Sequence, residues 1–232
     1  MNKIIKYFSD INDWNLALHI WDDENIVLEN RKNLAKKLGM EISDFIFMNQ
    51  VHSWKSVIVW EKNKWIWVKM IDEILSCDSI VTNTKWIGLS VLVADCIPVL
   101  LYDKKNWIIW VVHAWWKWTC LKILENTINN MYIIGAKKED IKVILWPSIS
   151  QISYEVWEDV WKYFIQEVKT KLINWKQFLD IKKQNYLDLL DLGIKDSNIE
   201  ILDIDTFTDN KYYSARRDWF NKGRFWCFIY IK

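Results

Sequence analysis

The most apolar part of the chain, GLSVLVADCIPVLLY at residues 88–102, is divided into short pieces rich in Val, Leu and Ile. Pieces of this kind are typical of buried β-strands. The run is too short to cross a bilayer and contains Asp95, so it predicts the interior of a globular fold. By the same criterion we expect strands at residues 45–51, 55–60, 79–82, 87–93, 97–102, 107–113, 141–145, 198–203 and 225–231.

Helices are predicted between these strands, at residues 23–38, 118–134, 155–169 and 181–192. The first begins with acidic residues and ends before Gly39. The second ends before Gly135 and carries one apolar stripe, made of Leu121, Leu124, Ile128 and Met131. Helices mixed with strands around an apolar middle predict an α/β fold, in which residues 1–232 form a single domain with mixed β-sheets flanked by helices.

The charges of the chain are nearly balanced, with 31 Lys and Arg residues against 30 Asp and Glu residues. No overall field therefore favours nucleic acid or a membrane surface as a partner. The N-terminus has no apolar segment long enough for a signal peptide, so we expect a cytoplasmic protein. The cysteines form no C-x-x-C pair, which favours reduced thiols over disulfides; they are Cys77, Cys96, Cys120 and Cys227.

The most unusual feature of the composition is 18 tryptophans beside only 5 glycines. Average usage of about 7% would give roughly 16 glycines in a chain of this length. Trp146 precedes Pro147 at the end of a predicted strand, and Trp219 lies in a polar loop. Both places are typical of a glycine turn, so a tryptophan there is expected to be strained and exposed.

Several segments, read in order, resemble the signatures of one family. They are NQVHSWKSV, CDSIVTNT, VLVADCIPVLLYD, WIIWVVHAWWKWT, ILWPSISQISYEVWEDV, YLDLLDLGI and YYSARRDWFNKGRF. The chain is similar to the laccase-domain family, also described as polyphenol oxidase, as purine nucleoside phosphorylase and as a peptidoglycan editing factor. The resemblance runs from about NDWNLALHIWDD to the C-terminus. It implies that the whole chain is one laccase-like domain.

The family pattern reads HAGW[RK]GT where this chain reads HAWWKWT, so Trp115 and Trp118 stand in place of glycines. The same replacement occurs at Trp14, Trp21, Trp54, Trp86, Trp110, Trp146, Trp157 and Trp219. Our hypothesis is that the gene uses UGA for glycine and that the codon was read as tryptophan. The alternative is a Trp-rich aromatic binding surface that belongs to the protein.

Three residues in these motifs suggest a metal site: His52, Cys96 and His113. Two imidazoles and a thiolate suit Zn²⁺ and leave a fourth position open, as in catalytic zinc sites. Their separations of 44 and 17 residues match no zinc finger, so the assignment rests on the resemblance, in which all three match the family's ligands. Copper is less favoured, because a multicopper cluster needs more than the three histidines of this chain. His19, the third histidine, is interpreted as structural.

Other polar residues are candidates for catalysis. Asp95 either orients a ligand histidine and moves protons, or is a turn residue that bonds to backbone. Lys117 and Arg216, with Arg217 and Arg224 nearby in the sequence, either form a cationic pocket for phosphate or belong to a solvated face. Two acidic residues in family motifs are also open to a turn or helix-start role, namely Asp78 and Glu155.

The resemblance implies purine nucleoside chemistry. The expected substrates are purine nucleosides and phosphate, with phosphorolysis of adenosine, inosine or methylthioadenosine and hydrolytic deamination of adenosine. Cys96, Asp95, Lys117 and Arg216 are the predicted catalytic residues, and a monomer or weak dimer is expected. One alternative is a peptidoglycan-precursor editing hydrolase that uses the same residues. The other is a non-catalytic Trp-rich ligand-binding module.

Overall fold

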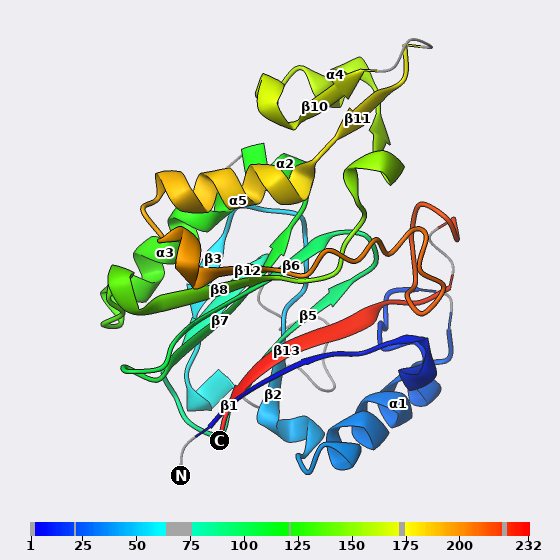
Figure 1. Cartoon of the computed structure of the whole chain (residues 1–232). Coiled ribbons are helices and arrows are strands. Elements are labelled where there is room, and N and C mark those ends of the chain that lie inside the picture. Colours follow the sequence, from blue (N-terminus) through cyan, green and yellow to red (C-terminus); the bar gives the residue numbers. More distant parts are fainter. Residues whose placement is uncertain (1–2, 21, 64–75, 121, 172–174, 220–221) are drawn as a thin grey trace.

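Two β-sheets form the centre of the molecule (Figure 1). The computed structural model describes residues 3–20, 22–63, 76–120, 122–171, 175–219 and 222–232. In the smaller of the two sheets, β13 lies between β1 and β5 and is antiparallel to both. Strand β2 pairs with β5 in parallel. Its strands, in spatial order, are β1 (Ile4–Phe8), β13 (Phe225–Ile231), β5 (Gly88–Val93) and β2 (Phe45–Phe47).

The larger sheet has six strands and is also mixed. The outer pairs β12–β8 and β3–β4 are parallel. The inner pairs β8–β6, β6–β7 and β7–β4 are antiparallel. In spatial order the strands are β12 (Ile199–Ile201), β8 (Ile141–Leu145), β6 (Ile97–Asp103), β7 (Ile108–Ala114), β4 (Ser79–Thr82) and β3 (Ser56–Ile58).

Strand β7 divides the core into two halves, because its successive side chains point to opposite faces. Ile109 and Val111 belong to a cluster shared with the four-stranded sheet and α1 (Glu24–Lys37). Ile108, Trp110 and Val112 belong to the other cluster, under α3 (Ile123–Ile133) and α5 (Ile181–Asp191). Figure 1 shows α1 beside the four-stranded sheet and α3 and α5 beyond the six-stranded one. The expected α/β fold with mixed sheets and flanking helices is confirmed.

The helix predicted at residues 155–169 is wrong. That segment begins as β9 (Glu155–Val156), continues as the short α4 (Glu158–Trp161) and ends in a single 3-10 turn. Val156, Phe164 and Val168 are buried, and their spacing by multiples of four imitates a helical stripe. β9 instead pairs with β11 (Gln177–Leu179), which pairs with β10 (Lys169–Lys171) in a small sheet at the top of Figure 1.

The helix predicted at 118–134 is two helices, α2 (Trp116–Cys120) and α3. Lys122 adopts a left-handed conformation, with φ of 56°, which ends one helix and begins the next. The expected stripe on α3 is buried at Leu124, Ile128 and Met131, while Leu121 lies outside the described residues. Strand β1 was not expected, and the strand predicted at 45–51 ends at Phe47. Among the described residues, no helix is long and apolar enough to cross a membrane.

The tryptophans at family glycine positions fall into two groups. Trp14, Trp86 and Trp219 are exposed and left-handed, with φ of 62°, 61° and 53°. Other members have ordinary backbone; Trp110 is fully buried in β7, where its Nε1 donates to Ser79 Oγ at 2.8 Å. The expectation for Trp146 is wrong, because its side chain is buried and packs edge-on against Phe8. Trp21 lies outside the described residues.

Candidate functional site

A cavity of about 520 Å³ lies where the chain crosses between the two large sheets. Residues 48–55 connect β2 to β3, residues 94–96 connect β5 to β6, and the segment after β12 returns to β13. Each of these connections places side chains in the wall of the cavity, and His113 is added from the end of β7. The volume is in the range of small-molecule sites. The cavity is therefore assembled from segments that are distant in the sequence.

Asp78 contacts one predicted ligand histidine, His113, and the residue that follows the other, Ser53. Its carboxylate is fully buried; Oδ1 lies 2.9 Å from His113 Nδ1, and Oδ2 accepts the Ser53 amide at 2.5 Å. Burial alone would lower the pKa of His113, but Cys96 and Asp78 outweigh it and raise the pKa to about 9. A carboxylate on the outer nitrogen of a histidine is a common device for orienting a metal ligand. Asp78 thus has an identifiable role as a positioning residue.

His52 lies in the connection after β2 rather than at the end of a strand. Its backbone is left-handed, with φ of 63°. The connection is anchored two residues earlier, where the Gln50 side chain donates to the Leu92 carbonyl and accepts the Leu92 amide, both at 2.8 Å. Partial burial and then the charge of His113 lower the pKa of His52. The His52 and His113 rings lie with centroids 5.4 Å apart.

Cys96 completes the predicted donor set. It precedes β6 and lines the same cavity as His52 and His113, and its charge contributes to the raised pKa of His113. Two imidazoles and a thiol fit zinc in kind. In the described part of the chain, however, no three His, Cys, Asp or Glu side chains are grouped closely enough to hold an ion. A shared metal therefore requires these three side chains to draw closer together.

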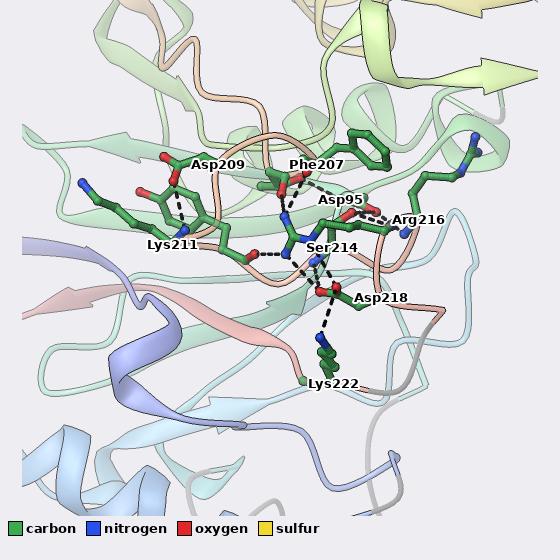
Figure 2. Close-up of polar contacts among 12 residues, drawn as sticks. Asp95, Phe207, Asp209, Lys211, Ser214, Arg216, Asp218 and Lys222 are labelled. Atoms are coloured by element: carbon green, nitrogen blue, oxygen red, sulfur yellow. Dashed lines mark hydrogen bonds and ion pairs between the residues drawn. The ribbon is translucent and has the colours of Figure 1, made fainter.

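Asp95 lines the cavity, but its oxygens are directed to another loop. Oδ1 accepts the Thr206 hydroxyl at 2.7 Å, and Oδ2 accepts the Ser214 hydroxyl and the Arg216 amide at 3.0 and 2.7 Å. Burial raises the pKa of Asp95, although these hydrogen bonds oppose the shift. Its backbone is left-handed, with φ of 78°. Figure 2 shows this cluster, from which the Arg216 side chain points away. Asp95 holds the 206–216 loop against the cavity.

The predicted cationic residues occupy different places. Arg216 lines the cavity, and its guanidinium donates to the Glu155 carbonyl and lies 5.4 Å from the Tyr154 ring centroid. Lys117 is exposed on α2 and is not among the residues that line the cavity, although its charge reaches His52. Arg217 is committed to Asp218 and to backbone carbonyls. Only Arg216 of these three therefore faces the cavity.

Sequence reasoning missed two residues of the cavity wall, His19 and Arg31. Partial burial and, after it, the charges of Arg224 and Arg31 lower the pKa of His19 to about 4, so the ring is neutral at pH 7. The interpretation of His19 as a structural residue is incomplete, since it faces the same cavity as His52 and His113. The only signal for it in the sequence is the scarcity of histidine, of which the chain has three; the structure brings all three to this cavity.

Comparison with known proteins places this chain in a family. Residues 7–232 match the family described as multi-copper polyphenol oxidoreductase laccase. The chain belongs to this laccase family. Its relatives carry other names. The chain is 33% identical over 214 residues to a purine nucleoside phosphorylase of Deinococcus radiodurans, covering 90% of this chain and 78% of that protein. It is 29% identical over 227 residues to adenosine deaminase RL5 of an unknown prokaryotic organism, covering 94% and 87%.

Solved structures agree with the laccase-family assignment. The hypothetical protein YfiH of Bacillus licheniformis superposes with a TM-score of 0.92 at 26% identity, covering 99% of this chain and 93% of that one. YlmD of Geobacillus stearothermophilus gives the same TM-score at 22% identity, with 97% and 91% covered, and shows the fold alone. The α/β fold predicted from the mixture of helices and strands agrees with the first of these structures over nearly the whole chain.

Proposed function

We propose that this laccase-family protein is a zinc-dependent enzyme of purine nucleosides, which cleaves adenosine, inosine or methylthioadenosine with phosphate and deaminates adenosine. One observation carries the proposal: His52, Cys96 and His113 converge on one cavity, with Asp78 holding His113 and the residue after His52. The names of the relatives, purine nucleoside phosphorylase and adenosine deaminase, supply the substrate class.

Zinc bound by these three residues would supply Lewis acidity at one end of the cavity. The residues of the chain do the remaining work. Asp78 accepts from His113 Nδ1 and so leaves the other ring nitrogen of His113 for a ligand in the cavity. Asp95 keeps the loop that carries Arg216 against the cavity wall. In deamination, water adds at C6 of adenine and ammonia leaves; in phosphorolysis, a phosphate oxygen attacks C1′ and the bond to the purine breaks.

The two reactions differ in what they require of the cavity. Phosphorolysis needs cationic groups that hold phosphate beside the ribose, whereas deamination needs only water. Lys117 and Arg216 were the cations predicted for this role, and Arg216 lines the cavity. Loss of Arg216 is therefore expected to reduce phosphate-dependent cleavage of inosine more than conversion of adenosine to inosine.

The proposal is tested by assaying adenosine and inosine, with and without phosphate, on zinc-loaded and chelated protein. Turnover should require zinc and should be lost in Cys96→Ala. The matched control is Cys120→Ala, which removes an exposed thiol of α2 that does not line the cavity. Equal loss in both cysteine variants would contradict the proposal. Hydrolysis of a muropeptide precursor without nucleoside turnover would replace it by the peptidoglycan-editing alternative.

A further inference from the structure

Arg31 is a buried cation in the wall of the cavity. It lies on α1, only 3% of its surface is exposed, and its Nε donates to the Leu16 carbonyl at 2.7 Å. The guanidinium lies over the Phe47 ring, 4.1 Å from the centroid. Burial lowers its pKa to about 9, so it stays charged at neutral pH. In the described part of the chain no carboxylate lies within ion-pair distance of it.

Arg224 lines the same cavity from the opposite end of the sequence, just before β13. Its guanidinium donates to the Gly223 carbonyl at 2.8 Å, and no ion pair joins it to any carboxylate of the described residues. Burial is the main influence on its pKa, which it lowers. The charges of Arg224 and Arg31 both act on His19. Arg31, Arg224 and His19 therefore line the same cavity.

The remaining wall offers little negative charge to these cations. Asp95 is the only carboxylate among the described residues that line the cavity. Both of its oxygens are already engaged by Thr206, Ser214 and the Arg216 amide. A buried charge without a counter-ion is costly, and a guanidinium matches the oxygens of phosphate in a two-pronged contact. A phosphate group bound here would supply the missing counter-ion and would match the geometry of the guanidinium groups.

We infer that Arg31 and Arg224 form a subsite for a phosphate group, in the same cavity that His19 and Arg216 line. The subsite gives phosphate one buried guanidinium, that of Arg31, and one half-buried guanidinium, that of Arg224, whereas Arg216 and Lys117 are exposed. This inference deepens the proposed function: the phosphate group is inorganic phosphate if the enzyme is a phosphorylase, and part of the substrate if it acts on a phosphate ester.

The test is calorimetric titration of the full chain with inorganic phosphate and, separately, with adenosine 5′-monophosphate. Arg224→Gln and Arg31→Lys should each weaken binding of the preferred probe by about tenfold to a hundredfold, because charge-assisted hydrogen bonds are lost. Lys32→Met is the matched control: it removes a positive charge from the next residue of α1, an exposed side chain that pairs with Glu29. Its affinity should equal that of the parent chain.

Circular dichroism establishes whether each variant is folded. If Arg31→Lys does not fold, because Arg31 is buried, the binding measured for Arg224→Gln decides the test alone. Unaltered affinity in folded Arg224→Gln and Arg31→Lys, or no binding of either probe by the parent chain, would overturn the subsite. Preference for inorganic phosphate identifies it as the co-substrate, and preference for the monophosphate identifies a phosphate ester. Arginine-dependent binding without nucleoside turnover would support the subsite and reject the proposed function. Nucleoside turnover without arginine-dependent binding would support the proposed function and reject the subsite.

Discussion

Left-handed backbone occurs in two contrasting regions of this molecule. One is a set of turns that carry tryptophan, with φ between 53° and 65°, namely Trp14, Trp86, Trp107, Trp175 and Trp219. The other is the cavity, where His52 and Asp95 have φ of 63° and 78°. Lys122, at the break between α2 and α3, is the remaining described residue of this kind apart from glycines. A side chain in this conformation costs roughly 1–3 kcal/mol.

The same strain has a different explanation in each region. In the cavity the side chain is needed, because His52 is a candidate ligand and Asp95 holds the 206–216 loop. At the turns the backbone favours glycine, and four of the five indoles are more than half exposed. Trp107 and Trp175 also each follow an asparagine in the sequence, and Asn-Gly is a preferred turn sequence. We infer that the UGA hypothesis extends to Trp107 and Trp175.

Glycine substitution at His52 should give the largest effect and separate the two regions. His52→Gly relieves the same backbone strain as a turn variant, but it removes a candidate ligand. Zinc content and nucleoside turnover should fall by about a hundredfold or more, since loss of even an outer partner of a metal ligand costs about 10–100-fold. Elemental analysis and the adenosine assay measure this, with Trp86→Gly as the control that keeps both. A fully active His52→Gly would remove His52 from the site.

A glycine at Trp110 tests whether every tryptophan at a family glycine position is strained. Trp110 is fully buried and its Nε1 is hydrogen-bonded, so Trp110→Gly should leave a cavity and cost about 3–5 kcal/mol. Chemical denaturation would measure the loss. A more stable Trp110→Gly would show that the core, like the turns, is built for glycine.

Glycine at the exposed left-handed positions should raise stability. Trp14→Gly, Trp86→Gly and Trp219→Gly each relieve about 1 kcal/mol of backbone strain, which raises the Tm of a chain this long by about 2–4 °C. Trp157→Gly is the matched control, because Trp157 is equally exposed but has ordinary extended backbone, with φ of −94°. A lower Tm in all three turn variants would show that the tryptophans belong, as a binding surface requires.

The smallest effect is expected at Trp115, which lines the cavity and packs against Tyr154 with ring centroids 5.0 Å apart. Trp115→Gly enlarges the cavity without relieving left-handed strain. We expect the KM for nucleosides to fall a few-fold, about 1 kcal/mol or less, with little change in Tm. Steady-state kinetics of adenosine would show it. A rise in KM would instead make the indole part of the substrate contact.

The central strands and α1 and α5 could be predicted from the sequence because their signals are local. Val- and Ile-rich runs gave β4 to β8 and β13, and an acidic start with a closing glycine gave α1. The 155–169 helix failed because Val156, Phe164 and Val168 repeat by fours while the chain turns between them. Such a stripe records burial and not backbone conformation.

The candidate site was only partly accessible to the same reasoning. His52, Cys96 and His113 came from the resemblance, and the structure brings them to one cavity. Arg31 could not be found, because an arginine within a charged helix looks solvated until the fold buries it. For Asp78 the sequence left a functional role and a turn or helix-start role both open, since its two partners lie 25 and 35 residues away.

The pairing of Gln50 with Leu92 makes one backbone amide a reporter of the His52 loop. The Leu92 N–H donates to the Gln50 side chain and not to another strand. Its exchange with solvent deuterium should therefore follow detachment of that single side chain, while its neighbours in β5 exchange only when the sheet opens. Slower exchange at Leu92 on addition of zinc would mean that metal binding closes the loop over the cavity.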